Sequence, residues 1–213
     1  MVVAATAATM GDRLHLPVSP IEVAQWRKKR RQELIFERTA LLQEARSNAA
    51  QLVSEHLLGF LRERRMPIEG KVISGYWPIK SEFDLRSFLS SCITHGARAA
   101  LPIVETNAGP LVFREWTQDS HMVRGFWNIP VPAGTDVLVP DRLLSPLVGR
   151  DRDGYRLGYG GGYFDRTLAA LNSPRLGIGV GLQSACIDTV FPQTHDVKMD
   201  LIVTDAGVQW SES

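Results

Sequence analysis

The sequence has few cysteines, no long apolar run and no excess of charge of either sign, and each absence narrows the class of protein. Its two cysteines, Cys92 and Cys186, are far apart and lack metal-ligand spacing. Neither a disulfide framework nor a zinc site is therefore expected, and a reducing cytoplasm is the simplest location. No apolar run approaches the ~20 residues that span a bilayer. The 24 basic side chains nearly cancel the 23 acidic ones, so net charge gives no reason to expect a nucleic-acid or membrane partner.

The beginning of the chain also lacks the features of a targeting segment. Residues 1–10 are small and apolar, without the basic start and long hydrophobic stretch of a secretory signal. A single arginine before residue 20, Arg13, gives little support to a transit peptide. We therefore expect residues 1–18 to form a disordered tail and residues 19–213 to form one α/β domain, because the length suits one substantial core.

Hydrophobic periodicity predicts helices first and then an alternation of strands and helices. Ser19-Pro-Ile-Glu22 is a capping box with proline at the first helical position, so a helix is expected to begin there. Apolar residues at helical spacing over 49–61, His56 among them, predict a second helix. Strands are expected at 72–77, 99–104, 136–139, 175–180 and 201–203, helices at 81–93 and 164–171, and a small appended hairpin at 107–116. This alternation predicts a mostly parallel sheet covered on both faces.

The most informative stretch runs from Arg156 to Arg166, because it combines glycines with charged residues at both ends. Glycines can turn through positive φ, so several backbone N–H groups can converge on one anion, and a helix beginning beside them would add its positive end. The pattern matches neither a Walker loop nor the dinucleotide fingerprint. A plain turn between strand and helix is the alternative. The four glycines are Gly158, Gly160, Gly161 and Gly162.

Phosphate transfer from ATP needs cations and a metal, and the sequence offers candidates for both. Arg27 and Arg31 are four residues apart and would share a helical face, although a solvated basic face is the ordinary alternative. Asp165 lies three residues after the last glycine of the run, and Asp196 and Asp200 precede an apolar strand. One or two carboxylates suffice for Mg²⁺, which prefers oxygen ligands and keeps several waters. Helix capping is the alternative for Asp165, and Asp196 and Asp200 could equally bond loop backbone before the strand.

The Gly-rich run, with Asp153-Gly-Tyr155 before it, resembles the signature of the 5-formyltetrahydrofolate cyclo-ligases, also called 5,10-methenyltetrahydrofolate synthetases. Motifs at 76–84, 101–102, 137–140 and 195–204 fall in the family's order, over roughly residues 20 to 205. The resemblance implies a three-layer αβα fold with a Rossmann-like sheet and N-terminal helices. It also implies ATP- and Mg²⁺-dependent conversion of 5-formyltetrahydrofolate to 5,10-methenyltetrahydrofolate, with release of ADP and phosphate.

The resemblance further implies a role for particular residues and a set of partners. Arg156 and Asp165 would be catalytic, and Asp165 and Asp196 would hold the metal. A reduced folate and ATP would be the ligands, and a monomer without nucleic-acid or membrane partners is expected. The ATP site would comprise Arg27, Arg31, Arg156, Gly158, Gly160, Gly161, Gly162 and Tyr163, and the folate site Trp77, Glu82, Tyr159 and Tyr163.

Alternatives to this interpretation remain open. Glu82 would be favourable in the first turn of the expected 81–93 helix whatever its function, and Trp77 could be a core residue at a strand end. Arg150 and Val131 depart from the family pattern, which motivates a member with a drifted ATP-dependent substrate specificity. A nucleic-acid-binding module that uses the basic 26–31 face is a rival of another class, with strongly salt-dependent binding as its discriminator.

Overall fold

The computed structural model describes residues 19–171 and 175–210, so the expected tail at 1–18 lies outside the described residues. Two long helices come first, α1 (Pro20–Ala40) and α2 (Gln43–Glu63). The predicted capping box begins α1, because the Ser19 hydroxyl accepts the Glu22 N–H and the Glu22 carboxylate accepts the Ser19 N–H. Within the described residues, no helix combines the length and apolarity needed to cross a membrane.

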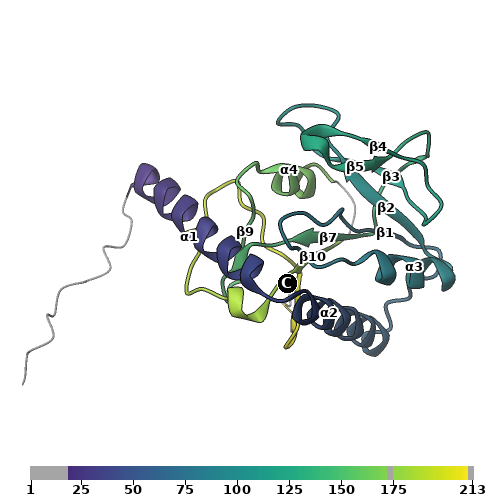
Figure 1. Ribbon diagram of the computed structural model, residues 1–213, viewed down its shortest axis with the longest axis horizontal. Helices are drawn as coiled ribbons and strands as arrows, with labels where there is room; N and C mark the ends of the chain where they lie inside the picture. Colours follow the sequence, from purple (N-terminus) through teal and green to yellow (C-terminus); the bar gives the residue numbers. More distant parts are fainter. Residues whose placement is uncertain (1–18, 172–174, 211–213) are drawn as a thin grey trace, which may run out of the picture.

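One large mixed sheet forms the centre of the molecule (Figure 1). Its strand order is β12-β11-β10-β7-β1-β2-β3-β6. The five middle strands, from β11 to β2, are parallel, and the outer strands β12, β3 and β6 pair antiparallel. The strands are β1 (Val72–Ser74), β2 (Arg98–Ile103), β3 (Val112–Glu115), β6 (Val137–Leu138), β7 (Arg142–Pro146), β10 (Leu176–Val180), β11 (Leu201–Thr204) and β12 (Gly207–Trp210).

Helices cover both faces of this sheet, as the three-layer prediction requires. Side chains alternate across each strand. Leu144 therefore packs in the main core with α2 and α3 (Arg86–Thr94), whereas its neighbour Leu143 lies in the cluster on the opposite face. Leu168 of α4 (Tyr163–Ala170) packs against that opposite face. The α1 helix contributes Leu34 to a separate small cluster beside the sheet.

Two short antiparallel ribbons flank the sheet. One pairs β4 (Met122–Arg124) with β5 (Pro130–Pro132), and the 3₁₀ helix Phe126–Asn128 forms its tip. The other pairs β8 (Gly149–Arg150) with β9 (Arg156–Leu157), and β9 leads into the Gly-rich loop. A second 3₁₀ helix spans Gln183–Ala185.

Several sequence predictions of local structure were wrong. The helix expected at 81–93 begins only at Arg86, because residues 79–82 form a turn in which the Glu82 carboxylate accepts the Ile79 N–H. The hairpin expected at 107–116 is present, since the turn joins β3 antiparallel to β2, but β3 is an integral strand of the main sheet and pairs with β6 on its other side. The central strand β7 was missed, since its apolar run is short and is bounded by prolines at 140 and 146.

Candidate active site

A cavity of about 910 Å³ lies at the carboxyl ends of the parallel strands β1, β2 and β7. Residues that follow or end these strands line it, among them Tyr76, Pro102 and Pro146. The Gly-rich loop, the beginning of α4, the inner side of α1 and the tip of the β4–β5 ribbon complete the wall. Every residue predicted for the ATP, folate and metal sites lines this one cavity: Arg27, Arg31, Trp77, Glu82, Arg156, Gly158, Tyr159, Gly160, Gly161, Gly162, Tyr163, Asp165 and Asp196.

The Gly-rich loop has the conformation that its composition predicts, but not at every glycine. Gly160 and Gly162 adopt φ of 93° and 64°, in the left-handed region that side chains rarely occupy. Gly162 is also the N-cap of α4. Gly161 has no positive φ; a side-chain carbon there would instead lie 3.0 Å from the Tyr163 ring. The loop therefore needs glycine for backbone conformation at 160 and 162 and for space at 161.

Three arginines face the loop, and protein groups hold each of them. Arg156 is 5% exposed, and its Nη2 lies 2.9 Å from Asp165 Oδ1. Burial lowers the pKa of Arg156, an effect that Asp165 and Asp196 oppose. Arg27 binds both oxygens of Asp196, at 2.9 and 3.2 Å. Arg31 donates from Nε to the Gly158 carbonyl at 2.5 Å, and burial, followed by repulsion from Arg27, lowers its pKa.

The basic residues of α1 divide between the side that faces the cavity and the rest of the helix. Arg27 and Arg31 lie on the inner face of α1, whereas Lys28, Lys29 and Arg30 are not among the residues that line the cavity. Part of the binding capacity of the arginine cluster is unused. The buried Nε atoms of Arg27 and Arg156 have no hydrogen-bond acceptor in the described part of the chain. Buried donors that lack an acceptor in the protein indicate a ligand whose oxygen atoms accept their hydrogen bonds.

Asp165 and Asp196 are the acidic side chains beside these arginines. The alternative of helix capping is wrong for Asp165, because Gly162 caps α4 and the Asp165 carboxylate accepts the Val197 N–H at 3.3 Å. Asp196 accepts the Gln193 N–H at 2.7 Å. Asp200, by contrast, accepts the Gly177 N–H at 2.7 Å and is not a cavity residue, so it supports the backbone.

The two carboxylates could supply only some of the ligands that a hard cation needs. Within residues 19–171 and 175–210, no group of three or more Asp, Glu, His or Cys side chains is placed to hold a metal. Asp165 and Asp196 both act on Arg156, so they face one small region. Mg²⁺ bound there would need phosphate oxygens and waters for its remaining positions, which is its usual mode in phosphate-binding sites.

Glu82 differs from these aspartates because it forms no ion pair with a described residue, although it is buried at 8% exposure. Its Oε2 accepts the Ile79 N–H at 2.9 Å, while its buried Oε1 has no hydrogen-bond partner among the described residues. Burial raises the pKa of Glu82 to about 7, against the opposing effects of the Ile79 N–H, the charge of Arg38 and the nearby Tyr159 hydroxyl. The carboxylate is therefore poised to change protonation near neutral pH and retains one oxygen for a ligand.

Aromatic side chains supply the apolar part of the cavity. Trp77 packs partly against the core, and the Arg86 guanidinium lies 4.5 Å from its ring centre, so the ring has both structural and cavity contacts. The Tyr163 hydroxyl donates to Asn107 at 3.2 Å. Trp127, 65% exposed at the ribbon tip, meets the Tyr163 ring edge-on at 5.5 Å.

Sequence reasoning missed three contributors to this site. Trp127 comes from a ribbon that was not predicted. Arg166 was named only as the charged end of the Gly-rich stretch, yet it holds the loop by donating to the Gly161 carbonyl at 2.7 Å. Arg38 was overlooked because it lies in an ordinary charged helix, although it contacts Lys80 and Tyr159. The helical spacing of Arg31 and Arg38, seven residues apart, is the signal that could have found it.

The two departures from the family pattern have different positions. Val131 lines the cavity. Arg150 does not: it is buried and donates to the side chains of Gln209 and Gln183 at 2.6 and 2.8 Å. The structure thus gives Arg150 a structural role and leaves Val131 as a possible determinant of specificity.

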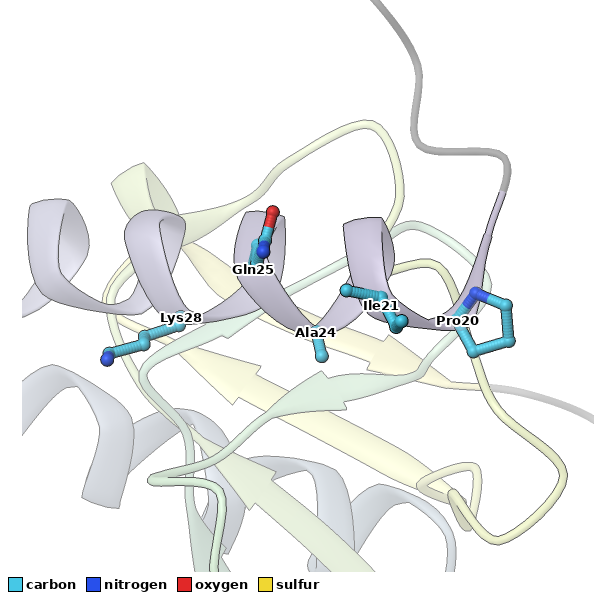
Figure 2. Close-up of a pocket in the computed structure, with 5 residues that line it drawn as sticks. All are labelled: Pro20, Ile21, Ala24, Gln25 and Lys28. Atoms are coloured by element: carbon cyan, nitrogen blue, oxygen red, sulfur yellow. The ribbon is translucent and has the colours of Figure 1, made fainter.

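A second, shallower hollow of about 380 Å³ lies along the beginning of α1. Figure 2 shows its five lining side chains arranged along one helix, with Lys28 as the one charged group. Ile21 is 72% exposed there. The hollow has no convergent polar groups to orient a ligand, unlike the main cavity.

The fold and the main cavity together define an α/β protein with a cationic ligand site at the carboxyl ends of its parallel strands. Residues 23–205 match the model of the 5-formyltetrahydrofolate cyclo-ligase family. The chain therefore belongs to that family, and it is a ligase by this membership.

Individual relatives agree with the family assignment. The chain is 30% identical over 182 residues to a 5-formyltetrahydrofolate cyclo-ligase of Mycolicibacterium smegmatis, covering 78% of this chain and 91% of the relative. It is 27% identical over 180 residues to one of Mycoplasma pneumoniae, covering 82% and 96%. Among solved structures, the 5,10-methenyltetrahydrofolate synthetase of Aquifex aeolicus superposes with a TM-score of 0.70 at 26% identity, covering 86% of this chain and 92% of that one.

Proposed function

We propose that the protein converts 5-formyltetrahydrofolate and ATP into 5,10-methenyltetrahydrofolate, ADP and phosphate. One observation carries the proposal: a single cavity joins a glycine and arginine cluster to the buried Glu82 carboxylate, whose Oε1 meets no hydrogen-bond partner in residues 19–171 and 175–210. The first suits phosphates. The second suits the paired N–H donors of an aminopyrimidine ring.

The proposed chemistry needs no protein nucleophile, which fits a cavity built for positioning and charge. The formyl oxygen attacks the γ-phosphorus as the bond to the ADP oxygen breaks. N10 then attacks the formyl carbon, the carbon–oxygen bond breaks, phosphate leaves, and the N10 proton is lost. The five-membered ring of the product closes in this second step.

The residues would divide this work between them. Arg156, Arg27 and Arg31 would bind the phosphates with the N–H groups of Gly158, Gly160, Gly161 and Gly162, and Arg156 would stabilise the charge on the transferred group. Asp165 and Asp196 would hold Mg²⁺, which neutralises phosphate charge. The arginines that now pair with these carboxylates would then shift towards the phosphate oxygens.

The folate would occupy the rest of the cavity. Glu82 would bind the pterin through its free oxygen, and Trp77, Tyr159 and Tyr163 would supply aromatic contacts to the ring. The proposal treats residues 19–213 as one catalytic domain that acts as a cytoplasmic monomer. The free thiols of Cys92 and Cys186 are compatible with that location.

A direct assay tests the proposed reaction. Purified protein with MgATP and 5-formyltetrahydrofolate should produce the near-ultraviolet absorbance of the methenyl product together with equimolar ADP, and omission of ATP or Mg²⁺ should abolish both. ATP binding without methenyl product would instead favour a drifted substrate, for which the position of Val131 is the motivating observation. Binding to oligonucleotides that weakens steeply with salt would favour the nucleic-acid alternative.

A further inference from the structure

Arg38 is a buried cation that forms no ion pair with a carboxylate of the described residues, although its charge acts on nearby Glu82. It lies in the last turn of α1 and is 7% exposed. Within the described residues its guanidinium forms no ion pair, and its hydrogen bonds go to neutral oxygens instead. Nε and Nη2 donate to the Lys80 carbonyl at 3.2 and 3.0 Å, Nη1 donates to the Leu147 carbonyl at 3.3 Å, and Nη2 donates to the Tyr159 hydroxyl at 2.5 Å.

These acceptors come from three segments that are distant in sequence. Lys80 lies in the loop after β1, Leu147 directly follows β7, and Tyr159 belongs to the Gly-rich loop. Burying an arginine without a counter-charge is costly, and apolar side chains would fill the same space at less cost. What an arginine adds is a rigid fork that fixes several acceptors at once.

The Lys80 carbonyl belongs to a strained turn. Lys80 and Ser81 both adopt positive φ, 46° and 61°, although neither is glycine. Such conformations persist only where surrounding contacts enforce them. The same turn carries Glu82 and holds its Oε2 against the Ile79 N–H. Oε1 lies at the cavity wall and has no hydrogen-bond partner in the described part of the chain.

Tyr159 is the second group that Arg38 holds at the cavity. Its hydroxyl accepts from Arg38, and its ring lies 5.1 Å from the Lys80 ammonium. Arg38 itself is not among the residues that line the cavity. Its hydrogen bonds to Tyr159 and to the Lys80 carbonyl connect it to groups that do line the cavity.

We propose that Arg38 is a positioning residue for the organic substrate, which holds the Tyr159 ring and the Glu82 carboxylate in the orientation that receives it. The inference rests on the proposed function for the identity of that substrate. The inner face of α1 would then serve both parts of the cavity. Arg27 and Arg31 face the Gly-rich loop, and Arg38, farther along the helix, holds the folate-binding groups.

The test uses two single variants, their combination and a matched control. Arg38→Lys keeps the charge but cannot bridge the Lys80 carbonyl and the Tyr159 hydroxyl together, and Tyr159→Phe removes only the hydroxyl. We expect each to raise KM and Kd for 5-formyltetrahydrofolate roughly tenfold or more, as for loss of a hydrogen bond to a charged group, and to leave those for ATP within about twofold. Because the two residues share the Arg38–Tyr159 hydrogen bond, the double variant should be less impaired than the product of the two single effects predicts. Arg30→Lys, on the same helix but outside the cavity, should match the wild type.

Each contrary outcome overturns the inference. A lower melting temperature with unchanged folate KM in Arg38→Lys would show a purely structural role. Equal increases in KM for folate and for ATP, or additive effects in the double variant, would also reject it. If Arg38→Lys fails to fold, Tyr159→Phe decides, and an unchanged folate Kd in that variant rejects the proposal.

The proposed reaction is judged separately, on the wild type alone. Absence of methenyl product from the wild-type protein would reject the reaction. Calorimetric titration of 5-formyltetrahydrofolate and of a non-hydrolysable ATP analogue into the same variants would then still measure the role of Arg38. A wild type that does not bind the folate at all would reject both.

Discussion

Replacing Glu82 with Gln should stabilise the protein at alkaline pH while impairing its function. Glu82 is buried among Tyr76, Tyr159, Arg38 and Lys80, with Asp84 farther off, and burial raises its pKa to about 7. The unfolded chain would ionise this group near the ordinary value of 4.5. Proton binding by Glu82 therefore favours the folded state: this contribution is fully present below about pH 4.5 and is lost as the pH rises through about 7.

The magnitude follows from the size of the pKa difference. A rise from 4.5 to about 7 corresponds to about 3 kcal/mol of unfolding free energy, at 1.36 kcal/mol per pKa unit. Glutamine has nearly the same shape as glutamate and stays neutral. The unfolding free energy of Glu82→Gln relative to the wild type should therefore rise by about 3 kcal/mol between pH 4.5 and pH 8, whatever constant offset the new amide introduces.

Urea denaturation at half-unit pH steps measures this difference. The same substitution at Glu63, which is exposed on α2, is the matched control and should leave the difference flat across the range. A flat profile for Glu82→Gln as well would refute the reasoning, because it would mean that Glu82 is ionised in the folded protein throughout. In enzyme assays the variant should raise KM for 5-formyltetrahydrofolate more than KM for ATP, and a change confined to ATP would reject the pterin assignment.

Four further substitutions test the remaining assignments, three in the site and one outside the cavity. Asp165→Asn should abolish formation of the methenyl product because it removes the charge that a hard cation requires, while the circular dichroism spectrum should stay native. Equal losses of melting temperature and activity would point to a structural role. Gly160→Val forces a branched side chain into a backbone φ of 93° beside the Arg31 guanidinium. The MgATP affinity measured by calorimetry should therefore fall at least tenfold. Unchanged affinity would mean that the nucleotide binds elsewhere. Gly161→Val should have the same effect through contact with the Tyr163 ring. Arg150→Gln should lower the unfolding free energy by roughly 1–3 kcal/mol with folate KM unchanged, because its partners Gln183 and Gln209 lie away from the cavity; a shifted KM would revive its role in specificity.

Some helices and strands and the Gly-rich loop could be predicted from the sequence because they depend on local interactions. The Ser19 capping box, the helical stripe of α2 and the alternation of strands and helices depend on neighbouring residues, and they predicted the architecture correctly. The Gly-rich loop was predictable for the same reason, since the conformational freedom of glycine is a property of the residue itself. The candidate ATP, folate and metal residues were all found in one cavity.

Tertiary structure decided what depends on partners distant in the chain. The central position of β7 could not be predicted, because it exists only through pairing with β1 and β10 on either side. The 79–82 turn replaced an expected helix because Arg38, from another element, binds the Lys80 carbonyl in a conformation that the local sequence disfavours. The raised pKa of Glu82 likewise has burial as its main cause, and burial is a property of the assembled fold. Residue types thus determined which chemistry was available, and long-range packing determined how each group is oriented and charged.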